Sequence, residues 1–290
     1  MEENIQPLLP EDYPNGVNTI DADYVRPGFT SSHLLVEKGH AAFIDTGTTR
    51  SVPLLLKVLE EKGISREKVT HVMVTHIHLD HAGGAGVLMQ QFPNAVLVVH
   101  PRGARHMIDP EKLIAGTVEV YGEENTRKHY GTIIPVQEDR VLIAEDKSRI
   151  DFHGRSLLIL DTPGHALHHY CIIDERTNNL FSGDNFGISC SEFDNEKGAF
   201  IFPTTTPVQF DPGAMLKTLD RLLNYEPQAV YLTHFGRVTN IQKLGLELCQ
   251  CLHQLVEMAL ELKKKGEAQQ EQLSAGVSKI LKDRLRKHNC

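Results

Sequence analysis

The sequence predicts an α/β fold in which two β-sheets are flanked by helices and followed by a helical C-terminal extension. Up to about residue 235, short apolar runs rich in β-branched residues alternate with segments of helical spacing. Side chains of the metal-binding type directly follow several of these runs. From about residue 240 onward, helical spacing continues without another strand pattern. Such alternation is typical of sheets covered by helices.

The N-terminal third is expected to form strands around one helix. Apolar, β-branched runs predict strands at 17–25, 32–37, 40–47, 69–76 and 95–100. Residues 49–62 (TRSVPLLLKVLEEK) have helical spacing and are followed by Gly63. Glycine commonly follows the last helical residue, so we expect the helix to end there.

A polar helical segment interrupts the strands in the middle of the chain. Residues 110–130 have the composition of an insertion, and insertions near a site often shape its pocket. Between about residues 140 and 184, five strands are predicted from the segments RVLIAED, SRIDFHG, SLLILDT, HYCIID and NLFSGD.

The last part of the chain is expected to be mostly helical. Residues 188–211 look irregular, and GAMLKTLDRLLN and AVYLTH then predict one amphipathic helix and one strand. Two further helices are predicted, at 241–265 and from about 269 to the end. We therefore expect a body at 1–238, with the helical insertion at about 110–130, and a C-terminal helical extension at 239–290.

Composition favours a protein that acts on small molecules. The 290 residues carry a formal charge of −8, whereas nucleic-acid binders normally present a basic face. The chain start has neither a basic nor an apolar signal region, and no apolar run reaches the ~18 residues of a membrane span. We expect a cytoplasmic protein that binds neither nucleic acid nor membrane. The five cysteines form no C-x-x-C pair and are expected to be reduced.

The segment THIHLDHAGG contains an unusual concentration of potential metal ligands. His76 and His78 are two residues apart, so they point the same way in an extended segment, and Asp80 and His81 follow in the turn. Two glycines then allow the backbone to approach a bound group closely and to turn into the next helix. A single tetrahedral ion cannot comfortably use all four side chains, whereas two neighbouring ions can.

Further candidate ligands follow other predicted strands. His165 lies in a Pro-Gly turn, Asp184 ends the segment LFSGD, and His234 follows AVYLT. Each residue comes directly after an apolar run, so all three are expected near one edge of the sheets. A site made of imidazole and carboxylate groups suits zinc, and also iron or manganese.

The motifs THIHLDHAGG, DTPGHALHH, FSGD and YLTHFG, in this order, resemble those of the metallo-β-lactamase superfamily, in particular its glyoxalase II-like branch. FIDTG at 43–47 is similar to an early strand and turn of that family. The resemblance covers about residues 30–236. It implies a four-layer αββα sandwich with two divalent metal ions, zinc first and iron or manganese as alternatives, at one edge of its sheets.

The resemblance also implies a role for each candidate ligand. One metal would be held by His76, His78 and His165, and the other by Asp80, His81 and His234. Asp184 would bridge the two ions. Asp45 would support the ligands by hydrogen bonds from behind.

A site of this kind predicts a hydrolase. Two ions can share a hydroxide that attacks the carbonyl of a small ester, thioester or lactone. Asp80 could carry protons as well as bind metal. A serine nucleophile is not required, and the chain contains no G-x-S-x-G motif.

Several residues near the motifs are candidates for the substrate pocket. His168 and His169 could act as bases or hydrogen-bond donors, or could simply begin the next strand. Phe193, Phe200 and Thr205 could form pocket walls or only pack their own loop. Arg237 could bind a substrate carboxylate or cap a helix.

Two other functions share these motifs. An iron-dependent persulfide dioxygenase would have the same His-x-His-x-Asp-His core. A di-iron protein that binds O₂ or NO is a non-hydrolytic alternative, although the related flavodiiron proteins usually have Glu at the position of His78 and carry a flavodoxin domain. The long helix at 241–265 could pack on its own body or on a second subunit, as in a homodimer. The C-terminal helices show no residues that match the glutathione site of glyoxalase II.

Overall fold

The computed structural model describes residues 10–205, 208–266 and 269–290. One sheet of seven strands is antiparallel over its first half and parallel from β4 to β7. In spatial order its strands are β1 (Glu11–Asp12), β2 (Val17–Asp21), β3 (Ser31–Glu37), β4 (His40–Ile44), β5 (Val69–Met73), β6 (Val96–Val99) and β7 (Val141–Ile143).

A second sheet of six strands faces the first. Its strands are antiparallel except for the parallel pair β11 and β14. In spatial order they are β15 (Gly236–Val238), β14 (Ala229–Leu232), β11 (Asn179–Phe181), β10 (Tyr170–Asp174), β9 (Arg155–Asp161) and β8 (Arg149–Phe152). A small hairpin of β12 (Ile188–Ser189) and β13 (Ile201–Phe202) lies in the segment expected to be irregular.

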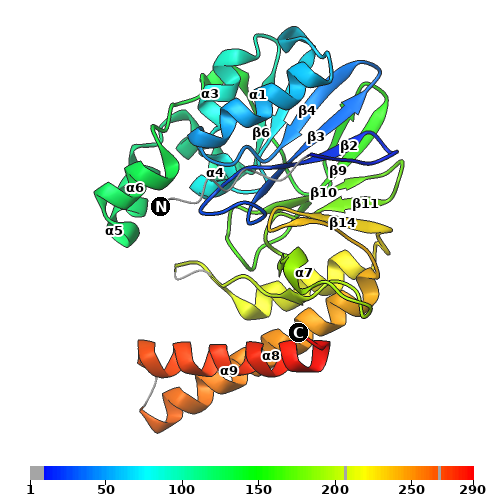
Figure 1. Ribbon diagram of the computed structural model, residues 1–290. Coiled ribbons are helices and arrows are strands. Elements are labelled where there is room, and N and C mark those ends of the chain that lie inside the picture. The colour runs from blue at the N-terminus through cyan, green and yellow to red at the C-terminus, as the bar shows by residue number, and fades with distance from the viewer. Residues whose placement is uncertain (1–9, 206–207, 267–268) are drawn as a thin grey trace, which may run out of the picture.

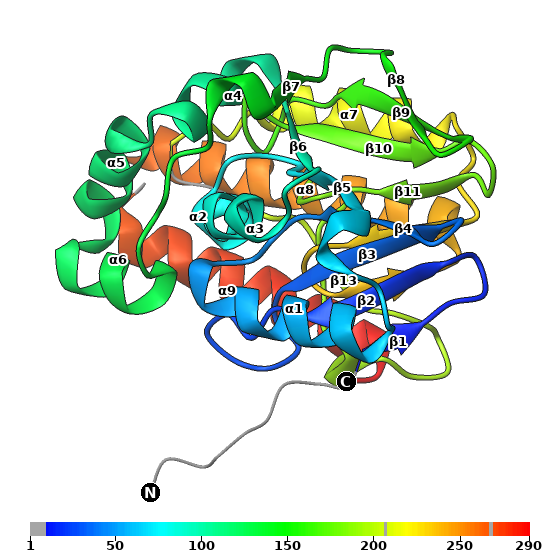
Figure 2. The ribbon, with the colours of Figure 1, turned by 90° about the horizontal axis from the view of Figure 1, so that it is seen from above.

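Helices cover both outer faces of this pair of sheets, which gives four layers (Figure 1). The helices α1 (Val52–Glu61), α3 (Ala85–Gln91) and α4 (Pro101–Ile108) pack on the seven-stranded sheet. The helices α7 (Pro212–Leu223) and α8 (Ile241–Lys265) pack on the other sheet, and α9 (Gln270–His288) packs on α8. Two more helices, α5 (Glu111–Tyr121) and α6 (Glu123–Tyr130), lie beside the sandwich (Figure 2).

Three apolar clusters lie between the four layers, and strand alternation assigns each side chain to one of them. On β4, Phe43 packs toward the helices, whereas Ile44 packs between the sheets. On β9, Leu158 packs toward α7 and α8, whereas Ile159 packs between the sheets. Because successive strand residues point to opposite faces, both sheets are buried on both sides. This explains the continuous apolar runs in the sequence.

A buried ion pair joins the central strands of the six-stranded sheet. Arg155 is completely buried, and its Nη2 donates a hydrogen bond to Oδ2 of Asp174 at 2.6 Å. Its Nη1 donates a hydrogen bond to the carbonyl oxygen of Asn15 at 2.8 Å. Burial of a guanidinium is tolerated here because its charge is paired with a carboxylate and both of its Nη atoms donate hydrogen bonds.

The predicted fold class is confirmed, with local differences. The helix α4 was not predicted, and its first turn is stabilised by His100, whose Nδ1 accepts a hydrogen bond from the amide of Arg102. Among the residues that the structure describes, no helix has both the length and the apolar character of a membrane span. The prediction of a chain start without a signal region concerns residues 1–9 among others. These nine residues lie outside the described residues. The division into a body and an extension at residue 238 stays a prediction.

Candidate metal centre

The THIHLDHAGG segment starts at the carboxyl end of β5, in the middle of the seven-stranded sheet. His78 has extended backbone angles and precedes the one-turn helix α2 (Leu79–Ala82), which carries Asp80 and His81. This change from extended to helical backbone brings the donor atoms of all four polar side chains together beyond the end of β5. The loop after β9 brings His165 to the same place, and the loops after β11 and β14 bring Asp184 and His234.

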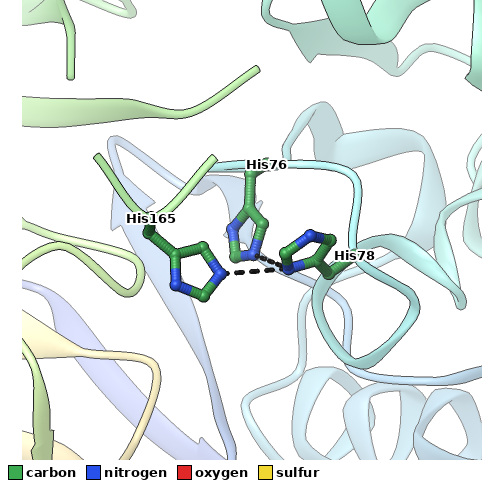
Figure 3. A group of neighbouring side chains, drawn as sticks. All are labelled: His76, His78 and His165. Atoms are coloured by element: carbon green, nitrogen blue, oxygen red, sulfur yellow. Dashed lines mark hydrogen bonds between the residues drawn. The ribbon is translucent and has the colours of Figure 1, made fainter. Parts of the chain in front are cut away.

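Three histidines converge on one point (Figure 3). Nδ1 of His78 lies 2.9 Å from Nε2 of His76 and 3.0 Å from Nε2 of His165. Two of the three imidazoles are buried completely or almost completely. The three nitrogens therefore form one face of a site that could hold a cation.

A second set of donors lies beside the first. Nε2 of His81 is 3.6 Å from Oδ2 of Asp80, and Nε2 of His234 is 3.5 Å from the same oxygen. Asp184 lies between the two sets: its Oδ1 is 3.2 Å from Nε2 of His81, and its Oδ2 is 3.3 Å from Nε2 of His165. Each oxygen of Asp184 thus faces a different set, as a bridging carboxylate requires.

The geometry and the donor chemistry fit a pair of divalent ions. Nitrogen and oxygen ligands at about 2.0–2.1 Å from a tetrahedral zinc ion lie about 3.3 Å from one another. The donor separations within each set, from 2.9 to 3.6 Å, are close to that value. Nε2 of His81 and Oδ1 of Asp184 are buried without a hydrogen-bond partner in the structure. Such atoms are costly unless a further group satisfies them, and a metal ion would do so.

Asp45 fixes the orientation of His81 from behind. Its carboxylate is completely buried and accepts a hydrogen bond from Nδ1 of His81 at 3.0 Å. It also accepts hydrogen bonds from the amide of Thr75 at 2.7 Å and from the hydroxyl of Thr233 at 2.7 Å. Because Nδ1 of His81 carries the proton toward Asp45, the lone pair of its Nε2 faces the candidate metal position.

Two other histidines are oriented in the same way by partners from distant segments. Nδ1 of His234 donates to the carbonyl oxygen of Phe29 at 3.0 Å. Nδ1 of His165 lies 3.0 Å from the hydroxyl of Thr204, and that hydroxyl donates to the carbonyl oxygen of Asp184. Thr204 can therefore accept the proton of His165. In both histidines, Nε2 is left as the donor toward the centre.

Electrostatics favour cation binding. Burial and the neighbouring histidines hold the pKa of His76 well below its ordinary value, and burial also lowers the pKa of His78 and lowers that of His165 to about 3. These imidazoles are neutral at pH 7 and can act as ligands. Burial alone would raise the pKa of Asp184, but the charges of His81, His165 and His234 lower it strongly. Asp184 is therefore an anion at pH 7.

The carboxylates around the second set of donors favour positive charge there. Burial lowers the pKa of His81, but the charges of Asp184, Asp80 and Asp45 outweigh this effect and raise it well above its ordinary value. Among the salt bridges of the described residues, those of Asp80 and Asp184 involve histidines, with no lysine or arginine. A divalent ion would supply the missing positive charge.

The two histidines after Leu167 lie in different environments. His169 is completely buried, and its Nε2 accepts a hydrogen bond from the amide of Asp184 at 3.1 Å. His168 lines the cavity described below, and its Nδ1 is buried without a hydrogen-bond partner. His169 therefore lies behind Asp184 and outside the cavity lining, whereas His168 is part of that lining.

Two glycines allow backbone segments to meet behind the ligands. At Gly84, a Cβ atom would lie 2.8 Å from the carbonyl oxygen of Thr48, so the glycine lets α2 pack against the loop after β4. This backbone contact is sufficient to account for the glycine. At Gly183, φ is +51° and a Cβ atom would lie 2.5 Å from Nε2 of His169. A side chain at Gly183 would therefore displace His169, which accepts the hydrogen bond from the amide of Asp184.

The candidate ligands lie at the floor of a large cavity. The cavity has a volume of about 1350 Å³, and His78, Asp80, His165, Asp184 and His234 are part of its lining. A single small ester would fill only part of this volume, since ligand pockets commonly measure about 300–1000 Å³.

The pocket residues predicted from the sequence lie in different parts of the structure. Thr205 lines the cavity. Phe193 and Phe200 instead stack edge to face on each other, and Phe200 packs on His288 near the chain end. Arg237 lies on the edge strand β15 with its guanidinium over the ring of Tyr13. Phe193, Phe200 and Arg237 are therefore not part of the lining of this cavity.

Sequence analysis missed an aromatic wall beside the ligands. The hydroxyl of Tyr24 donates a hydrogen bond to that of Tyr130 at 2.8 Å, and the two rings stack with centroids 5.6 Å apart. Both tyrosines line the cavity together with Phe29. The contact joins segments more than a hundred residues apart, so local sequence patterns gave no indication of it.

Comparisons with known proteins agree with this architecture. A metallo-β-lactamase fold-containing protein of Sulfurisphaera tokodaii is 25% identical over 234 residues, which cover 77% of this chain and 80% of that protein. A solved structure of an archaeal metallo-β-lactamase superfamily protein from Sulfolobus tokodaii is 26% identical, with a TM-score of 0.66, and the match covers 84% of this chain and 87% of that one.

Two named enzymes are also similar to the chain. An atrochrysone carboxyl ACP thioesterase of Pseudocercospora fijiensis is 24% identical over 240 residues, which are 80% of this chain and 57% of that enzyme. A hydroxyacylglutathione hydrolase of Bradyrhizobium is 26% identical over 180 residues, which are 60% of this chain and 54% of that enzyme. The chain thus spans little more than half the length of either enzyme.

The family model described as the metallo-β-lactamase superfamily matches residues 25–234, the region that contains most strands of both sheets and all seven candidate ligands. The chain belongs to the metallo-β-lactamase superfamily.

Proposed function

We propose that this protein is a dinuclear metal-dependent hydrolase that cleaves a small ester, thioester or lactone. The observation that carries the proposal is the arrangement of seven His and Asp donors from four loops as two neighbouring sets joined by Asp184. The two similar enzymes named above are a thioesterase and a hydrolase of a glutathione thioester, which supports this class of reaction.

Two divalent ions at these sets would supply a hydroxide at neutral pH and would stabilise negative charge on a carbonyl oxygen. We propose that His76, His78 and His165 hold one ion and that Asp80, His81 and His234 hold the other. Zinc is the first choice for this donor set, and iron and manganese are the alternatives.

The chain's own side chains would orient the substrate and move protons. Asp80 is partly exposed to the cavity, so its carboxylate can accept a proton from water and deliver it to a leaving group. His168 is part of the lining of the same cavity, so its ring can contact a bound substrate. The backbone amide of Asp184 donates a hydrogen bond to His169. Each oxygen of its carboxylate lies near a different donor set.

Activity assays on a panel of acyl thioesters, aryl esters and lactones test the proposal. We expect hydrolysis of at least one substrate class, loss of activity on chelation, and recovery when zinc is added back. Absence of hydrolysis by protein that contains two zinc ions would contradict the hydrolase. Oxygen-dependent absorption by two irons would favour the di-iron alternative, and one iron per chain with persulfide oxidation would favour the dioxygenase.

A further inference from the structure

The cavity extends well beyond the candidate ligands. From the floor it runs between α5 on one side and the α8–α9 pair on the other. Figures 1 and 2 show these elements on the same side of the sandwich, with the α5–α6 pair facing α8 and α9. Residues from Leu252 to Lys263 of α8 line the cavity, a wall about 16 Å long at 1.5 Å per helical residue.

Exposed apolar side chains are concentrated on these walls. In the described part of the chain, ten large hydrophobic residues are exposed, and half of them line this one cavity. These five are Val120, Tyr121, Val208, Leu260 and Val277. Single exposed apolar residues are ordinary, whereas a group of them around one concave surface marks a binding site for an apolar ligand.

The rest of the lining is also mostly apolar. Leu113 of α5 and Leu255, Met258 and Leu273 of α8 and α9 add further hydrocarbon surface. Lys112, Glu119 and Lys263 are the charged side chains of the walls away from the ligand floor. A small polar substrate would leave most of this surface in contact with water.

We propose that the substrate carries a medium- or long-chain acyl group, and that this chain lies between α5 and the α8–α9 pair. The inference rests on the proposed hydrolase, since it places the ester or thioester carbonyl of the same substrate at the ligand floor. The insertion and the C-terminal helices then form the two sides of one acyl-binding cleft, which we define by Leu113, Val120, Leu255, Met258, Leu260 and Val277.

The continuity of the cavity favours an acyl chain over a protein partner. His78 and Asp80 line the same cavity as Leu260 and Val277, so a single molecule can contact both the ligands and the apolar walls. Each methylene group that moves from water to such a surface strengthens binding by about fourfold.

Binding of non-hydrolysable analogues tests the cleft directly. The probes are S-butyl, S-octyl and S-dodecyl thioethers of N-acetylcysteamine, measured by titration calorimetry with the full-length protein as purified. We expect the octyl probe to bind about 250-fold more tightly than the butyl probe, because four methylene groups are added. The heat-capacity change should become more negative with chain length. Equal affinity for all three probes would overturn the proposal.

Two substitutions on the same helix provide a matched pair. Leu260 is 51% exposed and lines the cavity, whereas Leu246 is 59% exposed and lies outside its lining. We expect Leu260→Glu to weaken octyl binding at least tenfold and to leave butyl binding nearly unchanged. Leu246→Glu should bind all probes like the wild type. Val120→Glu, on the opposite wall, should behave like Leu260→Glu, and wild-type affinity in both cavity variants would overturn the cleft.

Hydrolysis of the matching acyl thioesters separates this proposal from the proposed function. Graded binding of the thioethers without hydrolysis of any thioester would support the cleft and contradict the hydrolase. Hydrolysis with the same kcat/KM for butanoyl and octanoyl thioesters, together with uniform binding, would support the hydrolase and contradict the cleft.

Discussion

Replacement of Asp45 by Asn should remove one metal ion and leave the other. In the wild type, Oδ2 of Asp45 accepts hydrogen bonds from Nδ1 of His81 at 3.0 Å and from the hydroxyl of Thr233 at 2.7 Å. An Asn amide nitrogen at this position would instead donate to His81 and shift its proton to Nε2. That nitrogen faces Asp184 at 3.2 Å and could no longer act as a ligand.

The expected magnitude follows from the lost hydrogen bond. A hydrogen bond to a charged group contributes about 1.5–3 kcal/mol, which corresponds to a loss of affinity of about 10- to 150-fold for the ion at the second donor set. The set formed by His76, His78 and His165 does not contact Asp45 and should keep its ion. Asp45 has a φ of +56°, a conformation that Asn tolerates well, so the backbone should not be strained.

Metal analysis after dialysis against a competing chelator measures this effect. We expect about two ions per wild-type chain and about one per Asp45→Asn chain. Thr233→Val is the control, because it removes one hydrogen bond to Asp45 without placing a donor opposite His81. Two ions of wild-type affinity in Asp45→Asn would refute the reasoning.

Four other substitutions test the surrounding structure. Asp174→Asn should destabilise the fold by about 3 kcal/mol in urea at pH 7, because it removes the nearer anion of the buried Arg155 guanidinium and leaves only Glu37, at 3.8 Å. Burial raises the pKa of Asp174, but the hydrogen bond from Arg155 lowers it below 3.8, so the difference from wild type should close as the pH falls below that value. Asp184→Ala should abolish hydrolysis while circular dichroism stays unchanged. His168→Ala should lower kcat/KM with both ions retained, whereas His169→Ala should also lower metal content.

Each of these predictions has a control or a contrary outcome. Glu175→Gln breaks a surface ion pair with Arg149 in the same sheet and should change stability much less than Asp174→Asn. Wild-type turnover in Asp184→Ala would exclude the dinuclear mechanism. Equal, small effects of the two histidine substitutions would show that neither residue has the role assigned to it.

Much of the fold was predictable because its signals are local. The strands β3, β4, β9 and β10 and the helix α8 were expected within a few residues, since apolar runs and helical spacing follow from residues close in sequence. The helix α4 was missed because Pro101 and Gly103 interrupt its pattern, and its start depends on a His100 cap. Tertiary contacts, not local preference, decide such elements.

The candidate ligands could be recognised because their signal is also local, whereas the groups that orient them by hydrogen bonds could not. One short segment contains His76, His78, Asp80 and His81, so these residues must lie close together in any fold. The orientation of His234 depends on a carbonyl group some two hundred residues away. Only the folded chain brings such partners together.

The pocket was the least predictable part. Phe200 has the residue type of a pocket wall, yet it packs on His288 of α9. The walls that the cavity does have come from α5 and from the C-terminal helices, whose apolar faces look from the sequence like ordinary core-facing stripes. Whether such a stripe is covered by the protein or left open to a cavity depends on how the helices are placed.

Anomalous diffraction from crystals of the zinc-loaded protein tests the central claim most directly. The account predicts two zinc peaks about 3.5–4 Å apart. One peak should be bound by His76, His78 and His165, the other by Asp80, His81 and His234, with Asp184 between them. A single peak, or zinc bound only at other side chains, would contradict it.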